Sequence, residues 1–174
     1  MGESGKKWKW KHIFVSTTNE EIFLMYDLTG EFEVKLDDKS RLRLPAQLMK
    51  QLAPNVSGKL VLNRGFEKCL LLYPADVWAE KTKEVNQLNT YNAKKRAFVR
   101  YFYRGATTVL PDANDRILLS KSLMEHAGID QEVILLAYHN QVEVWSKGTY
   151  LAMVAQEPEN FSDLAEEIFG EGNG

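Results

Sequence analysis

The stretch VKLDDKSRLRLPAQLM, residues 34–49, decides the fold because the chain contains it twice. A shift of 75 positions places it over VLPDANDRILLSKSLM, residues 109–124, with six identities in sixteen positions. The identical pairs are Val34/Val109, Asp37/Asp112, Arg41/Arg116, Leu44/Leu119, Leu48/Leu123 and Met49/Met124. Each copy then continues into two apolar, strand-like stretches. The sequence therefore predicts two copies of one structural unit.

Within a copy, the apolar residues follow the period of a strand with one wet face. Residues 32–36 alternate between apolar and charged side chains, and residues 41–44 alternate between arginine and leucine. The polar residues 37–40 between these runs fit a tight bend. A unit is thus predicted to run strand, bend, strand, short helix, strand, turn, strand.

The helix boundaries differ in residue type between the copies. Pro45 fits the first turn of a helix, where its missing N–H costs nothing. At the aligned place in the second copy, Ser120 is a suitable N-cap, and Gly128 is a suitable C-terminal stop. Two further helices are predicted between the copies, over residues 74–89 and 92–106, so the linker is expected to be structured.

Composition narrows the class of protein. The chain has 174 residues with 44% hydrophobic and 26% charged side chains, which is typical of a soluble globular protein. One cysteine, Cys69, excludes an intrachain disulfide, and its apolar surroundings favour burial. The three histidines match no metal-ligand or catalytic spacing, so neither metal, cofactor nor enzymatic activity is expected. A net charge of −2 leaves room only for a local polyanion site.

Targeting signals are also not evident. No apolar run approaches the length of about 20 residues that a bilayer crossing needs. The basic N-terminus lacks the hydrophobic segment of a signal peptide, so a cytoplasmic location is expected. An alternative reading of the N-terminus is that Met25 begins the functional domain and that residues 1–24 are an extension.

The repeated D-x-x-x-R bend, in residues 37–41 and 112–116, carries a family resemblance together with three longer motifs. These motifs are RLRLPAQL, LVLNRGFEKCLLLYP and KKRAFVRYFYRGAT. The combination resembles the MraZ family of bacterial transcriptional regulators over residues 25–150. The family usually has glycine before the motif arginine, whereas this chain has Ser40 and Asp115.

The resemblance implies an α+β fold, in which two tandem AbrB-like swapped-hairpin β units form a pseudo-two-fold β-barrel with peripheral helices. The expected organisation is an N-terminal extension (1–24), a first unit (25–78), a helical connector (79–105), a second unit (106–150) and an acidic C-terminal helix (151–174). The implied function is sequence-specific binding of double-stranded DNA.

In that function, a ring-shaped homo-oligomer at the nucleoid would bind short direct repeats. It would repress the division and cell-wall gene cluster, including its own promoter. No membrane and no small-molecule ligand is implied. The alternative is a ring-forming protein-interaction scaffold or an antitoxin-like module.

The first copy carries most of the cations that would meet DNA. If the leucines of residues 41–44 point into the core, Arg41, Arg43 and Lys35 share the opposite face, with Lys39 in the bend. Arginine suits guanine edges or phosphate, and lysine suits phosphate. The alternative is that these are solvating charges, partly neutralised by neighbouring acids. Asp37 and Asp112 are expected to hold the bends, through backbone N–H groups and the arginine four residues on.

The second copy is predicted to contribute less. At the places of Lys35 and Arg43 it has Leu110 and Leu118, so Arg116 is its one cation of this group. Two leucines on a wet face indicate cover by another segment or a neighbouring protomer. The first copy is therefore expected to dominate DNA contact.

Two further charged segments lie outside the bends, a basic stripe over residues 96–104 and an acidic tail after residue 150. Arg96, Arg100 and Arg104 recur every four residues beside aromatic side chains. They either form a second polyanion site or, as we favour, pair with acids across a helix or subunit interface. The tail has six acids and no base after residue 150, and its apolar residues from Phe161 to Ile168 form a helical stripe that is expected to dock.

Overall fold

The computed structural model describes residues 26–156 and 160–170. The expected extension over residues 1–24 therefore lies outside the described residues. So do three of the six acids of the tail, namely Glu157, Glu159 and Glu171.

The elements alternate as the repeat predicts. The strands are β1 (Leu28–Lys35), β2 (Arg41–Arg43), β3 (Leu60–Arg64), β4 (Leu70–Pro74), β5 (Thr107–Val109), β6 (Arg116–Leu118), β7 (Glu132–His139) and β8 (Gln141–Ser146). The helices are α3 (Ala46–Gln51), α4 (Ala75–Lys81), α5 (Lys83–Asn86), α6 (Ala93–Tyr103), α7 (Lys121–Ala127), α8 (Lys147–Val154) and α9 (Phe161–Gly170). Strand, bend, strand, helix, strand, turn, strand is confirmed in both copies.

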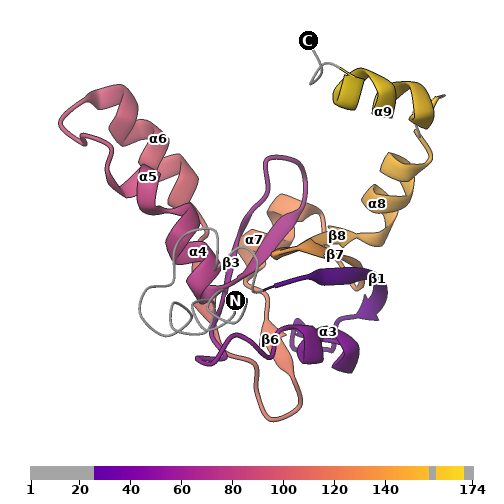
Figure 1. Cartoon of the computed structure of the whole chain (residues 1–174). Coiled ribbons are helices and arrows are strands. Elements are labelled where there is room, and N and C mark those ends of the chain that lie inside the picture. The colour runs from indigo at the N-terminus through magenta and orange to yellow at the C-terminus, as the bar shows by residue number, and fades with distance from the viewer. Residues whose placement is uncertain (1–25, 157–159, 171–174) are drawn as a thin grey trace, which may run out of the picture.

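The two units exchange their first strands. A six-stranded antiparallel sheet has the order β1-β7-β8-β4-β3-β5 (Figure 1). β1 of the first unit pairs with β7 of the second, and β5 of the second unit pairs with β3 of the first. β2 and β6 form a separate two-stranded sheet. Each unit is thus completed by the other.

The mixed helix and strand fold with two repeated units agrees with expectation, but the expected barrel is not found closed. β1 and β5 stand at opposite edges of the six-stranded order, with no hydrogen-bonded ladder between them in the described residues. Each of these strands pairs along one of its two hydrogen-bonding edges, β1 with β7 and β5 with β3, and its second edge has no strand beside it there, so the sheet stays open. The unit boundaries predicted from the sequence stay a prediction.

The leucines shared by the copies form the centre of the core. Leu44 and Leu119, which follow β2 and β6, are each 2% exposed. Leu48 of α3 and Leu123 of α7 are 0% and 1% exposed. Burying side chains of this size contributes about 1.5–3 kcal/mol each, so the repeated leucines account for the repeated scaffold.

The helix ends follow the sequence signals. Ser120 Oγ accepts a hydrogen bond from the Leu123 N–H at the start of α7, and Gly128 ends α7 in the left-handed conformation, at φ 62°. Pro45 lies just before α3 as its N-cap, one position earlier than the first-turn place expected. Both predicted signals of the second copy are confirmed.

The linker helices form an arm. The predicted helix over residues 74–89 is divided into α4 and α5 at Thr82, whose Oγ1 donates to the carbonyls of Trp78 and Ala79. Such back-bonding commonly disturbs a helix. α6 returns beside them, and the arm projects from the sheet on one side (Figure 1). Trp78 and Phe102 stack at its base, with ring centroids 5.6 Å apart.

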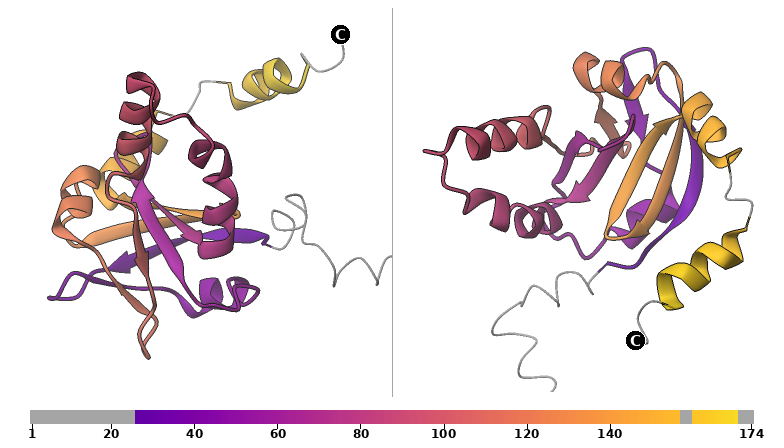
Figure 2. Two further views of the ribbon diagram at one scale, coloured as in Figure 1. Left: turned by 90° about the vertical axis from the view of Figure 1, so that its left-hand side faces the viewer. Right: turned by 90° about the horizontal axis from the view of Figure 1, so that it is seen from above.

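The C-terminal segment lies on the other side of the molecule. α8 is fixed to β1, because Tyr150 Oη donates to Glu31 at 2.8 Å and Lys147 forms an ion pair with Glu33. α9 extends beyond α8, away from the α4–α6 arm, as Figure 1 and the right-hand view of Figure 2 show. Phe161 and Ile168 of α9 are 76% and 60% exposed, so the apolar stripe expected to dock is open on this chain.

Candidate nucleic-acid interface

The two D-x-x-x-R bends meet at the two-stranded sheet of β2 and β6, which we call the ribbon. Leu42 pairs with Ile117 at its centre, and Arg43 pairs with Arg116. Leu42 and Ile117 are buried at 0% and 1% exposure. Because side chains alternate along a strand, the arginines lie on the opposite, outer face. Both bends project beyond the body of the protein (Figure 2).

Each bend turns through a left-handed residue. Ser40 and Asp115 both have φ 58°, at the place where the family usually has glycine. In the first bend the Ser40 N–H donates to the Asp37 carbonyl at 3.0 Å, and in the second the Asp115 N–H donates to the Asp112 carbonyl at 2.9 Å. The departure in residue type therefore leaves the two bends alike in backbone conformation.

The bend aspartates hold the motif arginines. Asp37 Oδ1 accepts the backbone N–H groups of Lys39 and Arg41, while its Oδ2 accepts Arg41 Nε at 2.7 Å. Asp112 repeats the pattern, with Oδ2 accepting Arg116 Nε at 2.8 Å. A guanidinium held through Nε keeps its Nη groups available as donors. The aspartates thus orient the two arginines.

The same contacts shift the acidities of the aspartates. The Arg41 backbone N–H, followed by contributions from the Arg41 side chain and the Lys39 N–H, holds the pKa of Asp37 below its usual value. At Asp112, desolvation raises the pKa, but hydrogen bonds from Arg116 and Asn114 outweigh it and lower the pKa overall. Both carboxylates are therefore charged at neutral pH.

The bends are also locked to each other. The Leu44 N–H donates to the Asp115 carbonyl at 2.8 Å, and the Leu119 N–H donates to the Ser40 carbonyl at 3.0 Å. Arg43 Nε donates to the Asn114 carbonyl at 3.2 Å. Arg43 of the first copy is therefore positioned by the bend of the second.

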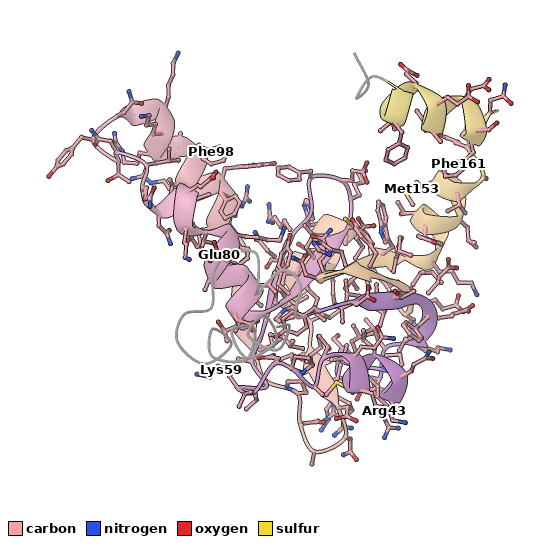
Figure 3. The ribbon with its side chains drawn as sticks, viewed as in Figure 1. Arg43, Lys59, Glu80, Phe98, Met153 and Phe161 are labelled. Atoms are coloured by element: carbon pink, nitrogen blue, oxygen red, sulfur yellow. The ribbon has the colours of Figure 1, made fainter. Side chains whose placement is uncertain are left out.

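The structure separates the cations that the sequence grouped. Arg41, Arg43 and Arg116 come together on the ribbon, and Lys39 is exposed in the first bend. Figure 3 shows Arg43 at the edge of the molecule, remote from the α4–α6 arm. Lys35 instead ends β1 in the larger sheet, where it pairs opposite Glu132. Lys35 is thus the member of the group that does not belong to the ribbon.

Leucines occupy the equivalent places in the second copy. Leu118 lies opposite Arg41 on the ribbon and is 60% exposed, and Leu110 is 65% exposed. Within residues 26–156 and 160–170, neither side chain has the cover that the sequence led us to expect. Cover by a neighbouring protomer stays a prediction.

The ribbon can hold a planar anion or base edge, but it is not a strongly positive surface. Its cations are Lys39, Arg41, Arg43 and Arg116, and the acids of the bends are Asp37, Asp38, Asp112 and Asp115. The four charges of each sign balance. Binding of a polyanion by one ribbon must therefore depend on positioned arginine donors and stay weak without repetition.

Sequence reasoning missed that the two copies share the ribbon. It placed the cations on one face of the first copy, whereas β2 of the first copy pairs with β6 of the second. The repeat itself held the signal, because Leu42 and Ile117 are equivalent positions and lie opposite each other at the pseudo-two-fold axis. The carbonyl of Asn114, which accepts from Arg43, had no signal in the sequence.

Other chemistry has little support in the part of the chain that the structure describes. No cluster of His, Cys, Asp or Glu side chains there is suited to hold a metal ion. Cys69 is buried, and desolvation raises the pKa of its thiol to about 12, which leaves it protonated. Among the described helices, none has both the length and the apolar character for crossing a membrane.

Two strand-exchanging repeats that build one arginine-bearing ribbon define a tandem-repeat protein with a candidate nucleic-acid-binding face. A family described as "MraZ protein, putative antitoxin-like" matches twice, over residues 28–101 and 102–171. The chain belongs to the MraZ family.

The chain aligns with nearly the whole length of several curated relatives. The chain is 41% identical to a protein of Christiangramia forsetii over 84% of this chain and 95% of the relative. It is 36% identical to a protein of Cytophaga hutchinsonii over 79% and 91%, and 37% identical to one of Desulforamulus reducens over 80% and 95%. Each relative is named "Transcriptional regulator MraZ".

Proposed function

We propose that the chain is a sequence-specific DNA-binding transcriptional regulator that represses the bacterial division and cell-wall gene cluster, including its own promoter. It acts at the nucleoid, in the cytoplasm, as a ring oligomer on short direct repeats. The observation that carries the proposal is the cluster of Arg41, Arg43 and Arg116 on the projecting ribbon. The names of the relatives support it.

The arginines have separate roles in the proposed complex. Arg41 and Arg116 are held through Nε by their aspartates, so their Nη groups meet base edges or phosphates without a large loss of side-chain entropy. Arg43 is the more exposed and makes the closest approach to a base edge. Lys39 contributes a phosphate contact. Lys35, on the larger sheet, adds a phosphate contact at the margin.

Repetition is what makes such a small site useful. One ribbon has balanced charge, so a single copy binds DNA weakly and loses affinity with salt. Linking copies at a spacing that matches direct repeats raises avidity by about 10²–10⁴. A ring is an arrangement that supplies equal spacing.

Footprinting on DNA upstream of the protein's own gene tests the proposal. The wild-type protein is expected to protect regularly spaced repeats. Arg41→Ala combined with Arg43→Ala is expected to weaken protection about 100-fold, since two positioned arginines are lost. The matched control is Lys94→Ala with Lys95→Ala, which removes two cations from α6, outside the ribbon. Equal losses in both double variants, or no protection by the wild type, would contradict the proposal.

Arg116→Ala tests the unequal use of the copies. We expect a smaller loss of promoter affinity than from Arg43→Ala, because the second copy has Leu118 where the first has Arg43. If Arg116→Ala weakens promoter binding as much as Arg43→Ala or more, the first copy does not dominate DNA contact.

A protein partner for the ribbon is the second candidate, favoured by the antitoxin-like description of the family. The two candidates differ in salt dependence. Displacing counterions from DNA makes binding fall steeply with salt, whereas a protein contact falls less. The footprinting titration, repeated across salt concentrations, separates them.

A further inference from the structure

A pocket of about 330 Å³ lies where the α4–α6 arm joins the sheet, and we call it the arm groove. Six aromatic side chains line it, from β3–β4, α4 and α6: Phe66, Tyr73, Trp78, Phe98, Tyr101 and Phe102. Phe66 is 100% exposed and Tyr101 is 71% exposed. An aromatic surface this open is typical of a protein-binding site.

The arm groove has only one sign of charge. Its charged residues are Arg64 and Lys81, and no aspartate or glutamate lines it. Arg64 Nε is a buried donor that has no acceptor within residues 26–156 and 160–170, and His126 Nε2 is likewise without a partner there. The groove therefore suits an occupant with apolar side chains and carboxylate acceptors.

α9 has these properties. Phe161, Leu164 and Ile168 lie one helical turn or two apart and form one face, and they are 76%, 36% and 60% exposed. The helix also carries Asp163, Glu166 and Glu167 and no basic residue. An amphipathic helix with an open apolar face requires a surface to bury it.

We propose that α9 of one copy docks into the arm groove of a neighbouring copy. The charges and the apolar faces are complementary. The occupant comes from another copy because α8 is fixed to β1, whereas the groove lies over β4 and β3 toward the other edge of the six-stranded sheet. Phe161 and Phe98 accordingly lie on separate limbs of the chain (Figure 3). Six residues, 155–160, separate the two helices.

The contact is head to tail. Each copy gives one helix and offers one groove, so the same contact repeats from copy to copy and produces a closed ring when the rotation per copy allows it. The inference builds on the ring that the proposed function invokes and assigns its joint. DNA binding is not part of the contact, so the two can fail separately.

Two full-length variants break the two sides of the joint. Leu164→Asp with Ile168→Asp places charges on the apolar face of α9, and its matched control, Ser162→Asp with Gly170→Asp, adds the same charges elsewhere on the helix. Tyr101→Asp places a charge in the groove, and its matched control is Tyr91→Asp, at a side chain that is 96% exposed and outside the groove.

The masses of these proteins are measured without DNA, by light scattering after size exclusion. The wild type and both controls are expected to form oligomers of one size. Each joint variant is expected to associate at least about 30-fold more weakly and to run as a 20.0 kDa monomer. Circular dichroism checks folding, and Phe98→Ala is a milder second groove variant.

Mixing the two joint variants is the decisive step. One has an intact groove and the other an intact α9, so a mixture is expected to form a one-to-one dimer that neither forms alone. A mixture that stays monomeric would overturn the inference, because an intact groove and an intact α9 would then be present without joining. Unchanged oligomers in either joint variant, or a monomeric wild type, would equally overturn the inference, while promoter binding by the ribbon would be judged on its own.

Discussion

The first and second bends have the same backbone and present different surfaces. Asp37 and Asp112 hold their arginines through the same oxygen, and Ser40 and Asp115 share φ 58°. On the outer face of the ribbon, however, the first copy has Arg43 at the position where the second copy has Leu118. The residues that repeat build the ribbon, and the residues that do not repeat determine what its outer face offers to a partner.

The buried faces of the two copies should be equivalent, and breaking either has the largest expected effect. Leu42→Ala and Ile117→Ala each remove a nearly fully buried side chain at the centre of the ribbon. We expect each to lower the free energy of unfolding by about 3 kcal/mol. Urea unfolding measures this, and Leu118→Ala, at a 60% exposed side chain, is the control with little effect. A cost confined to one copy would contradict a shared core.

The outer faces should become equivalent when the missing arginine is added. Leu118→Arg places a cation opposite Arg41, and we expect promoter affinity to rise about tenfold, since one arginine contact adds about 1–3 kcal/mol. A promoter titration at fixed salt measures the change. Leu110→Arg is the control, because it adds the same charge at another exposed leucine off the ribbon. Equal gains would show that charge alone, not place, is responsible.

The contributions of Asp37 and Asp112 to stability at acid pH should differ modestly. A lowered pKa in the folded state means that the stability contributed by each carboxylate is present at neutral pH and is lost as the pH falls below 3.8. Asp37 also has Arg116 Nη1 at 3.8 Å, so Asp37→Asn should flatten the acid limb of the melting temperature more than Asp112→Asn does. Thermal melts from neutral pH down to about pH 2.5 test this. If the melting temperatures of the two variants fall equally with pH, Arg116 does not contribute to the effect of Asp37.

The smallest expected difference lies in the left-handed residues. Serine in this conformation is strained, whereas aspartate tolerates it better, so Ser40→Gly should stabilise the protein by about 0.5 kcal/mol. Asp115→Gly should change stability by about zero, because relief of strain is offset by the greater freedom of the unfolded chain. Paired urea titrations compare them. A larger gain at Asp115 would reverse this account.

Local features were predictable because each depends on neighbouring residues. The repeat, the bends, the cap at Ser120 and the stop at Gly128 are all written in short stretches of sequence, and all are found. The left-handed conformation of Ser40 and Asp115 was not predicted, because neither residue type requires it.

Long-range pairing was less predictable. Alternation tells which face of a strand is wet but not which strand lies beside it, so the shared ribbon and the position of Lys35 on the larger sheet could not be deduced from period alone. The apolar face of α9 was expected to dock, and on this chain it is exposed. These features depend on contacts between distant residues or between copies.

The exchange of β1 and β5 imposes a delay between the synthesis of β1 and the synthesis of the strand with which it pairs. Leu28 pairs with His139, about 110 residues later, so β1 leaves the ribosome long before its partner exists. At about 5–20 residues per second, the interval lasts roughly 5–20 s. During this interval the nascent first half has an unpaired β1, and its apolar residues that pack against the second half in the folded protein are exposed. Nascent chains on one message are therefore at risk of exchanging β1 with each other, and slow translation lengthens that risk.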